Sequence, residues 1–156
     1  MPRIHIIGAP GSGKTTYARK LANKLNLPLC CLDEIYHDNS GSKPRKRSET
    51  ERTNMAKKFA AKQNWVSEGA SFSDWVNPIL ERATEIHIIS PAKTTRVYRQ
   101  IKRYIKRKLG IEKSTYKETL SGLWGGIKWT CRYERDTLPI ILNKIPKRTK
   151  IYKIKR

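Results

Sequence analysis

Glycine, lysine and threonine recur at a fixed spacing near the start of the chain, within the stretch GAPGSGKTT. Their order fits the pattern G-x-x-x-x-G-K-[ST], in which a glycine-rich turn directs backbone N–H groups at phosphates. The lysine adds a positive charge for the terminal phosphates, and the hydroxyl that follows it suits Mg²⁺. The stretch therefore predicts a site for ATP and Mg²⁺ that is formed by Gly8, Pro10, Gly11, Ser12, Gly13, Lys14, Thr15 and Thr16.

The residues on either side of this stretch have the patterns that a phosphate-binding loop needs. The run IHII at 4–7 is rich in β-branched residues and has room for one buried strand. A helix is predicted after the loop, because large side chains recur every four residues from Tyr17 to Leu25. A strand before and a helix after favour a phosphate-binding loop over a glycine turn that only joins two elements.

The chain has 156 residues, a length that suits a single domain over 1–156. Its charge is unusually positive. Lysine and arginine number 34 against 13 aspartates and glutamates, so the formal net charge is +21. Such an excess favours polyanionic partners such as nucleotides or nucleic acid. A general habit of lysine-rich composition is the alternative explanation.

The cysteines and the hydropathy pattern bear on the compartment. Cys30, Cys31 and Cys131 have no metal-binding spacing, and their odd number without a secretory signal predicts a reducing cytoplasm. No stretch approaches the ~20 apolar residues of a membrane span, so no membrane partner is expected.

Predicted strands and helices alternate along the chain. Strands are expected at 29–33, 64–68, 85–90 and 151–154, and helices at 48–62, 71–83 and 93–109, with a basic surface loop over 34–48. The spacing of Ser48 and Glu51 predicts a capping box at the start of one helix. Such alternation indicates a parallel α/β sheet, whose ligands bind beyond the carboxyl ends of the strands. Asp33 and Glu68 follow two of those ends.

Four stretches in this order resemble a known family. GAPGSGKTTYARKL, LDEIYH, WVSEGAS and the arginine-rich helix after ISP are similar to the adenylate-kinase-like P-loop nucleotide kinases. They are more closely similar to the small P-loop proteins described as DNA topology modulation proteins. The resemblance covers about residues 3 to 143, and it departs from the family where Glu68 stands in place of an aspartate.

The resemblance implies a three-layer P-loop NTPase fold of the α/β class. It implies a five-stranded parallel sheet in the order 2-3-1-4-5, with a small helical lid at about 107–135. The segment 34–63 would then lie on the acceptor side, where its basic loop could capture a phosphorylated acceptor. That loop carries Lys43, Arg45, Lys46 and Arg47.

Roles for individual side chains follow from the motif and from the resemblance. Lys14 would reach the β and γ phosphates, and Thr15 would bind Mg²⁺ with Asp33 or Glu68 acting through water. Asp33 is also the candidate for orienting the acceptor, although an aspartate that caps the next turn is the simpler explanation. Arginines on both sides of the lid would neutralise charge during transfer, namely Arg99, Arg103, Arg132 and Arg135.

Two functions remain open at this point. The first is an ATP-dependent phosphotransferase that moves the γ-phosphoryl group of ATP–Mg²⁺ to a small acceptor with a phosphate or hydroxyl group, for which we expect a nucleoside monophosphate. The second is a nucleic-acid-associated NTPase or polynucleotide kinase, whose basic surface holds DNA or RNA. The complete set of motif residues argues against a protein that binds nucleotide without turnover.

Overall fold

Five parallel strands form the centre of the protein, in a computed structural model that describes residues 1–41, 45–112 and 119–155. They lie in the order β2-β5-β1-β6-β7, which is second, third, first, fourth and fifth when only the strands of this sheet are counted. This is the order that the resemblance implies. The strands are β1 (Arg3–Ile7), β2 (Leu29–Cys31), β5 (Trp65–Glu68), β6 (Glu85–Ile89) and β7 (Lys150–Ile154).

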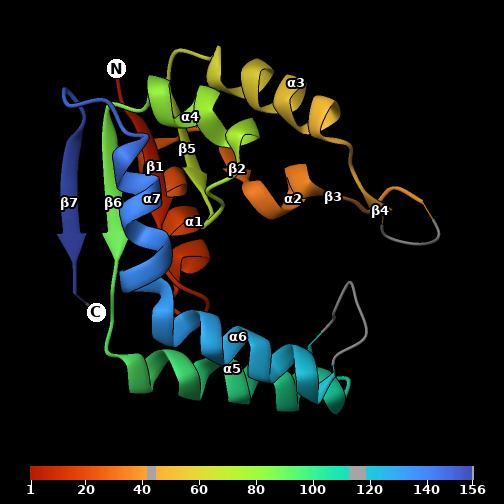
Figure 1. The fold of residues 1–156 in the computed structure, drawn as a ribbon. Coiled ribbons are helices and arrows are strands. Elements are labelled where there is room, and N and C mark those ends of the chain that lie inside the picture. The colour runs from red at the N-terminus through yellow and green to blue at the C-terminus, as the bar shows by residue number, and fades with distance from the viewer. Residues whose placement is uncertain (42–44, 113–118, 156) are drawn as a thin grey trace.

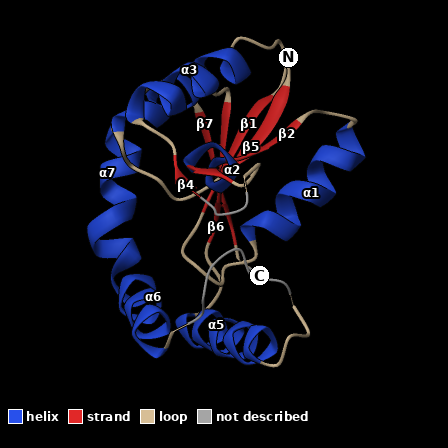
Figure 2. Cartoon of the chain, turned by 90° about the vertical axis from the view of Figure 1, so that its right-hand side faces the viewer, coloured by secondary structure: helices blue, strands red, loops and turns tan. Residues whose placement is uncertain are grey.

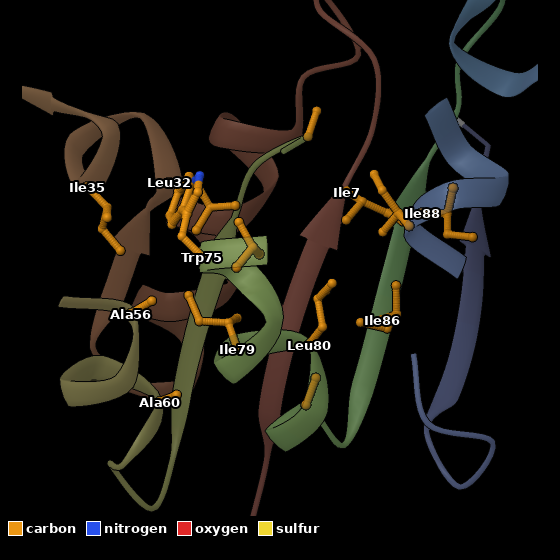
Figure 3. Packing of buried hydrophobic residues seen from close by; sticks show 14 of the residues in the cluster. Ile7, Leu32, Ile35, Ala56, Ala60, Trp75, Ile79, Leu80, Ile86 and Ile88 are labelled. Atoms are coloured by element: carbon orange, nitrogen blue, oxygen red, sulfur yellow. The ribbon is translucent and has the colours of Figure 1, made fainter. Parts of the chain in front are cut away.

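Helices cover both faces of the sheet (Figures 1 and 2). Helix α1 (Lys14–Leu25) covers one face, where Ile4 and Ile6 of the central strand pack with Ala18 and Ala22. The other face carries α3 (Glu49–Ala60), α4 (Asn77–Arg82) and α7 (Leu138–Asn143). Alternate residues of the strands point to this second face, and Figure 3 shows Ile7, Ile86 and Ile88 there with side chains of α4. The three-layer α/β architecture is therefore confirmed.

The capping box that the sequence predicts begins α3. The hydroxyl of Ser48 accepts a hydrogen bond from the N–H of Glu51 at 3.2 Å, and the N–H of Ser48 donates to Glu51 Oε2 at 2.7 Å. Two N–H groups that the first turn would leave unpaired are satisfied in this way. The final strand is also confirmed, since β7 pairs with β6 at the edge of the sheet.

The segment after β2 differs from the prediction. The strand ends at Cys31, and α2 (Leu32–Tyr36) starts where the sequence predicted further strand and then a loop. Asp33 and Glu34 occupy the first turn of α2, where carboxylates favour a helix because they complement its positive N-terminal end. A two-stranded hairpin of β3 (His37–Asp38) and β4 (Arg45–Lys46) follows, and Lys43 lies outside the described residues.

Two helices extend away from the sheet at the bottom of Figure 1. They are α5 (Lys93–Lys108) and α6 (Leu120–Arg132), which lie side by side, and the π-helical turn η2 (Tyr133–Thr137) joins α6 to α7. The lid that we expect at about 107–135 corresponds to the end of α5, α6 and η2, while 113–118 fall outside the described part. No helix in the described part is long and apolar enough to cross a membrane.

Candidate functional site

The glycine-rich stretch forms a cradle of unpaired backbone N–H groups between β1 and α1. Gly11 and Gly13 have φ values of 77° and 87°, a left-handed conformation that glycine adopts without strain. The first hydrogen bond of α1 runs from Tyr17 N to Gly13 O at 3.0 Å, so the N–H groups of the three residues before it have no partner within the helix. In the described part of the chain, five N–H groups here lack an acceptor: those of Gly11, Gly13, Lys14, Thr15 and Thr16.

A cavity of about 330 Å³ lies over this cradle, and two arginines from α5 share its lining. Arg99 Nη1 donates hydrogen bonds to Ser12 O at 3.2 Å and to Gly11 O at 3.4 Å, which ties α5 to the loop. Unpaired amides at a helix N-terminus beside positive charges make a strong site for phosphate. The lining residues are Gly11, Ser12, Gly13, Lys14, Thr15, Thr16, Arg99 and Arg103.

The other two predicted lid arginines are placed differently. Arg132 and Arg135 are exposed, and neither lines this cavity. Arg135 Nε lies 2.6 Å from Asp136 Oδ1, in an ion pair between neighbouring residues on the surface. The structure therefore brings Arg99 and Arg103 to the loop and leaves Arg132 and Arg135 away from it, so their catalytic role remains a prediction.

Glu68 accepts two hydrogen bonds at the end of β5. Thr15 Oγ1 donates to its Oε1 at 3.1 Å, and Cys31 Sγ donates to the same oxygen at 2.9 Å. Burial, together with the charge of Glu68, raises the pKa of the Cys31 thiol well above its usual range, so the thiol stays protonated and can donate. Only 2% of Glu68 is exposed, so its orientation is set by these two contacts.

The predicted metal residues are brought together only in part. Thr15 and Glu68 are in contact, whereas Asp33 is exposed on the first turn of α2 and lines neither of the two cavities described for this chain. The described residues contain no group of three histidine, cysteine, aspartate or glutamate side chains that could hold a metal ion. Any Mg²⁺ here must therefore complete its shell with water and with oxygens of a ligand.

A second cavity of about 390 Å³ lies beside α2 and α3, in the predicted acceptor segment and the loop after β5. Its main cation is Arg52, whose guanidinium lies 4.8 Å from the ring of Tyr36 and 5.6 Å from that of Trp75. Its Nε donates to Ser48 O at 3.2 Å, and no described carboxylate forms an ion pair with it. The lining residues are Tyr36, Lys46, Glu49, Arg52, Phe72, Ser73, Asp74 and Trp75.

Arg52 was not among the predicted site residues. In the basic loop that we expected to capture the acceptor, Arg45 and Arg47 are bonded to other groups of the protein. Arg45 pairs with Asp38 at 3.0 Å and with Glu51 at 2.9 Å. Arg47 donates to the carbonyls of Glu34 and His37, both at 2.6 Å, and so fixes the hairpin. The positive charge of the second cavity therefore comes from Arg52 and Lys46, and its lining also carries the carboxylates of Glu49 and Asp74.

Two polar contacts with buried side chains join α5 to η2 and to α6, and no local pattern in the sequence indicates either. Arg96 Nη1 lies 2.5 Å from Glu134 Oε1, although Arg96 is only 2% exposed. Gln100 Nε2 donates to Thr130 Oγ1 at 2.8 Å, and both side chains reach the carbonyl of Pro10. These partners are 30 and 38 residues apart in sequence, beyond the reach of local patterns.

Comparison with known sequences gives short matches. No family model matches the chain. A shikimate kinase of Corynebacterium jeikeium (strain K411) is 48% identical over 40 residues, and one of Paracidovorax citrulli (strain AAC00-1) is 45% identical over 42 residues. These matches span 26% and 27% of this chain but only 22% and 23% of the two relatives.

Solved structures match over nearly the whole chain. A shikimate kinase from Acinetobacter baumannii in complex with shikimate has a TM-score of 0.63 at 16% identity, covering 100% of this chain and 84% of that one. A gluconokinase from Sinorhizobium meliloti 1021 has a TM-score of 0.55 at 11% identity, covering 99% and 82%. A sugar kinase from Janibacter sp. HTCC2649 has a TM-score of 0.57 at 14% identity, covering 97% and 83%. The chain therefore has a P-loop kinase fold.

Proposed function

We propose that this protein is an ATP-dependent phosphotransferase that acts on a small acceptor carrying an anionic group. The observation that supports this proposal most is the cradle of five unpaired N–H groups, with Lys14, Arg99 and Arg103 beside it. Catalysis of phosphoryl transfer consists mainly of positioning and charge neutralisation, and these groups supply both. An acceptor oxygen attacks the γ-phosphorus, the bond to the β–γ bridging oxygen breaks, and ADP leaves.

Thr15 and Glu68 fit a magnesium ion bound with the triphosphate. The hydroxyl of Thr15 would be a direct ligand, and the carboxylate of Glu68 would hold a bound water, since Mg²⁺ usually keeps several waters. The ion would supply neutralisation of charge on the β and γ phosphates. Asp33, on α2, remains our candidate for orienting the acceptor, as the resemblance implies.

The second cavity is our candidate acceptor site. It lies beyond the carboxyl ends of β2 and β5, on the same edge of the sheet as the cradle, because all five strands are parallel. A buried guanidinium stacked on two rings, without a carboxylate partner, suits a carboxylate or phosphate of the acceptor. Asp74 adds little negative charge there, because Lys144 Nζ lies 2.7 Å from its Oδ1.

Two kinds of acceptor have this chemistry. A nucleoside monophosphate carries a phosphate that can be the acceptor itself. A small hydroxy acid carries a carboxylate for Arg52 and a hydroxyl for the transfer, and two structurally similar proteins are named for shikimate and for gluconate. We propose the anionic group as the shared requirement, with the nucleoside monophosphate as one member of the class.

A screen of ADP release tests the proposal. The chain is incubated with ATP–Mg²⁺ and, in separate arms, nucleoside monophosphates, hydroxy acids, matched neutral polyols, and single-stranded DNA and RNA. We expect release that depends on an anionic small acceptor and that falls at least about 10²-fold in Lys14→Ala. Release stimulated only by DNA or RNA, with an affinity that falls steeply with salt, would overturn the proposal in favour of the nucleic-acid alternative.

A further inference from the structure

The carbonyl of Pro10 is held from outside the phosphate-binding loop by two side chains. Gln100 Nε2, on α5, lies 3.4 Å from Pro10 O, and Thr130 Oγ1, on α6, lies 3.3 Å from the same oxygen. The two side chains are also bonded to each other, since Gln100 Nε2 donates to Thr130 Oγ1 at 2.8 Å. Gln100 is 5% exposed and Thr130 is 0% exposed, so water does not compete for these contacts. Both helices thus converge on one backbone oxygen of the loop.

The direction of that carbonyl fixes the direction of the next N–H group. In a trans peptide the C=O and the following N–H point in opposite directions, and the described chain has no cis peptide. When Pro10 O points outward to Gln100 and Thr130, the N–H of Gly11 points to the opposite side. That N–H is one of the five without an acceptor in the described residues.

The same relation holds two residues along the loop. Arg99 Nη1 donates to Ser12 O at 3.2 Å, and the N–H that follows this carbonyl belongs to Gly13, which also lacks an acceptor. The N–H between these two, that of Ser12, is used internally, because it donates to Ala9 O at 3.1 Å. Thus the free N–H groups of Gly11 and Gly13 each follow a carbonyl that accepts a hydrogen bond from a side chain of α5 or α6.

We infer that Gln100 and Thr130 are positioning residues for nucleotide binding: they hold the Pro10 carbonyl outward so that the N–H of Gly11 is aimed at the triphosphate. The inference rests on the proposed function. It goes beyond that function because it makes the α5–α6 pair, rather than the loop sequence alone, responsible for the geometry of the cradle. Neither residue touches the nucleotide in this scheme.

A glycine on α6 leaves the room that this arrangement needs. A Cβ on Gly126 would lie 3.0 Å from Gln100 Oε1, closer than ordinary contact, whereas a Cβ on its neighbour Gly125 would meet nothing within 4 Å. Both glycines are inside α6, so replacing either with alanine raises helix propensity by the same amount. The pair therefore provides a test variant and a matched control.

The first experiment is titration calorimetry of ATP–Mg²⁺ with the full chain and its variants. Gln100→Ala and Thr130→Val should each weaken ATP binding between about tenfold and a hundredfold, since an amide that bonds a charged phosphate would lose its aim. Thr130→Ser keeps the hydroxyl and should restore most of the affinity that Thr130→Val loses. Gly126→Ala should weaken ATP binding at least about threefold, whereas Gly125→Ala should bind as the unchanged chain does.

Thermal unfolding and acceptor kinetics separate positioning from a merely structural role. All affinities are measured well below the unfolding temperature of each variant, and the KM for the acceptor should change much less than the KM for ATP. Lower unfolding temperatures with unchanged ATP affinity would overturn the inference and leave the proposed function standing. If the unchanged chain gives no heat with ATP–Mg²⁺, the proposed function fails, and the inference fails with it.

Discussion

Thr15 and Glu68 share a hydrogen bond of 3.1 Å, although 53 residues separate them along the chain. The contact joins the first turn of α1 to the end of β5, and the register of the sheet makes it possible, because Ile6 of β1 lies opposite Glu68. Cys31 approaches the same carboxylate oxygen from β2. Side chains from α1, β5 and β2 therefore meet at the place where we expect the metal ion.

Glu68→Gln should lower the rate at saturating Mg²⁺ between about tenfold and a hundredfold and raise the Mg²⁺ concentration needed for half of the maximal rate. The amide cannot replace the carboxylate as an acceptor from Thr15, Cys31 and a metal-bound water together. The measurement is the rate of ADP release across a magnesium titration. Cys31→Ala should move the Mg²⁺ requirement in the same direction by a smaller factor.

The neighbouring thiol is the control for Cys31. Cys30 packs against the main core, and its thiol is directed to the carbonyl of Cys31 rather than to Glu68, so Cys30→Ala should leave the magnesium requirement unchanged. Equal effects of the two cysteine variants would mean that the Cys31 thiol does not orient the carboxylate.

Arg52→Ala should raise the KM for the acceptor between about tenfold and a hundredfold while the affinity for ATP stays the same, because the guanidinium lies in the second cavity. Arg52→Lys keeps the charge but loses the planar stack on Tyr36 and Trp75, so we expect an intermediate KM. Steady-state kinetics with the best acceptor of the screen gives both constants. Arg45→Ala is the control, since Arg45 is paired with carboxylates at the surface. A parallel loss of ATP affinity in Arg52→Ala would place Arg52 on the donor side.

Arg99→Ala should lower kcat/KM for ATP by about 10³-fold, because Arg99 both lines the nucleotide cavity and holds the carbonyl of Ser12. Arg135→Ala should leave kcat/KM nearly unchanged, because Arg135 pairs with Asp136 at the surface and does not line the nucleotide cavity. Initial rates at varied ATP concentration give kcat/KM for both variants. A loss of about 10³-fold in Arg135→Ala would instead show that Arg135 reaches the phosphates in the reacting state, as the resemblance implies.

Stability should fall as the pH is lowered from about 6.5 towards 4, in part because of His5. Burial lowers the pKa of His5 from 6.5 to about 4, so between these values the unfolded chain binds a proton that the folded chain does not. The contribution of His5 is complete above pH 6.5 and amounts to about 3 kcal/mol, with a slope of about 1.4 kcal/mol per pH unit. Urea unfolding of the chain and of His5→Gln at pH 5.0 to 7.0 measures it. The free energy of unfolding of His5→Gln should depend less steeply on pH, by about 1.4 kcal/mol per pH unit. Identical slopes for the two proteins would exclude His5 as the source.

Local patterns in the sequence predicted most of the fold. The phosphate-binding loop, the capping box of Ser48 and Glu51, and the alternation of strands and helices depend on residues close together in the chain. The strand order followed from the resemblance, and the structure has the same order. The start of α2 was missed even though Asp33 and Glu34 provide a signal for a helix N-terminus, because LCCLD also forms a plausible buried strand.

The face that α5 buries could not be predicted from hydrophobic periodicity. Its apolar residues recur every four positions, yet Ile101 is 39% exposed and Ile105 is 50% exposed. Arg96 and Gln100 are buried instead, where Arg96 Nη1 pairs with Glu134 and Gln100 Nε2 donates to Thr130 from the following segment. A pattern rule assumes that apolar groups drive burial, and it cannot detect a polar side chain whose partner comes 30 or more residues later.

The candidate acceptor cavity was missed for a similar reason. Arg52 looked like one basic residue among many on a helix, and its importance depends on Tyr36 and Trp75, which different elements bring to it. The density of positive charge in the loop favoured the loop as the acceptor site, although Arg45 and Arg47 bond to nearby groups of the hairpin and of α3. Composition shows how much charge is present but not which charge is left without a partner.

The central position of β1 has a consequence for synthesis of the chain on the ribosome. Strand β1 is made before β5 and β6, with which it pairs, so it does not have both neighbours until Ile89 has been made. The carbonyl of Pro10 lacks its partner on α6 for longer, because Thr130 follows it by 120 residues. A nascent chain released before that point would carry the complete GAPGSGKTT stretch and still lack the contacts that shape it. Acquisition of ATP affinity would therefore come after the sheet and α6 have formed.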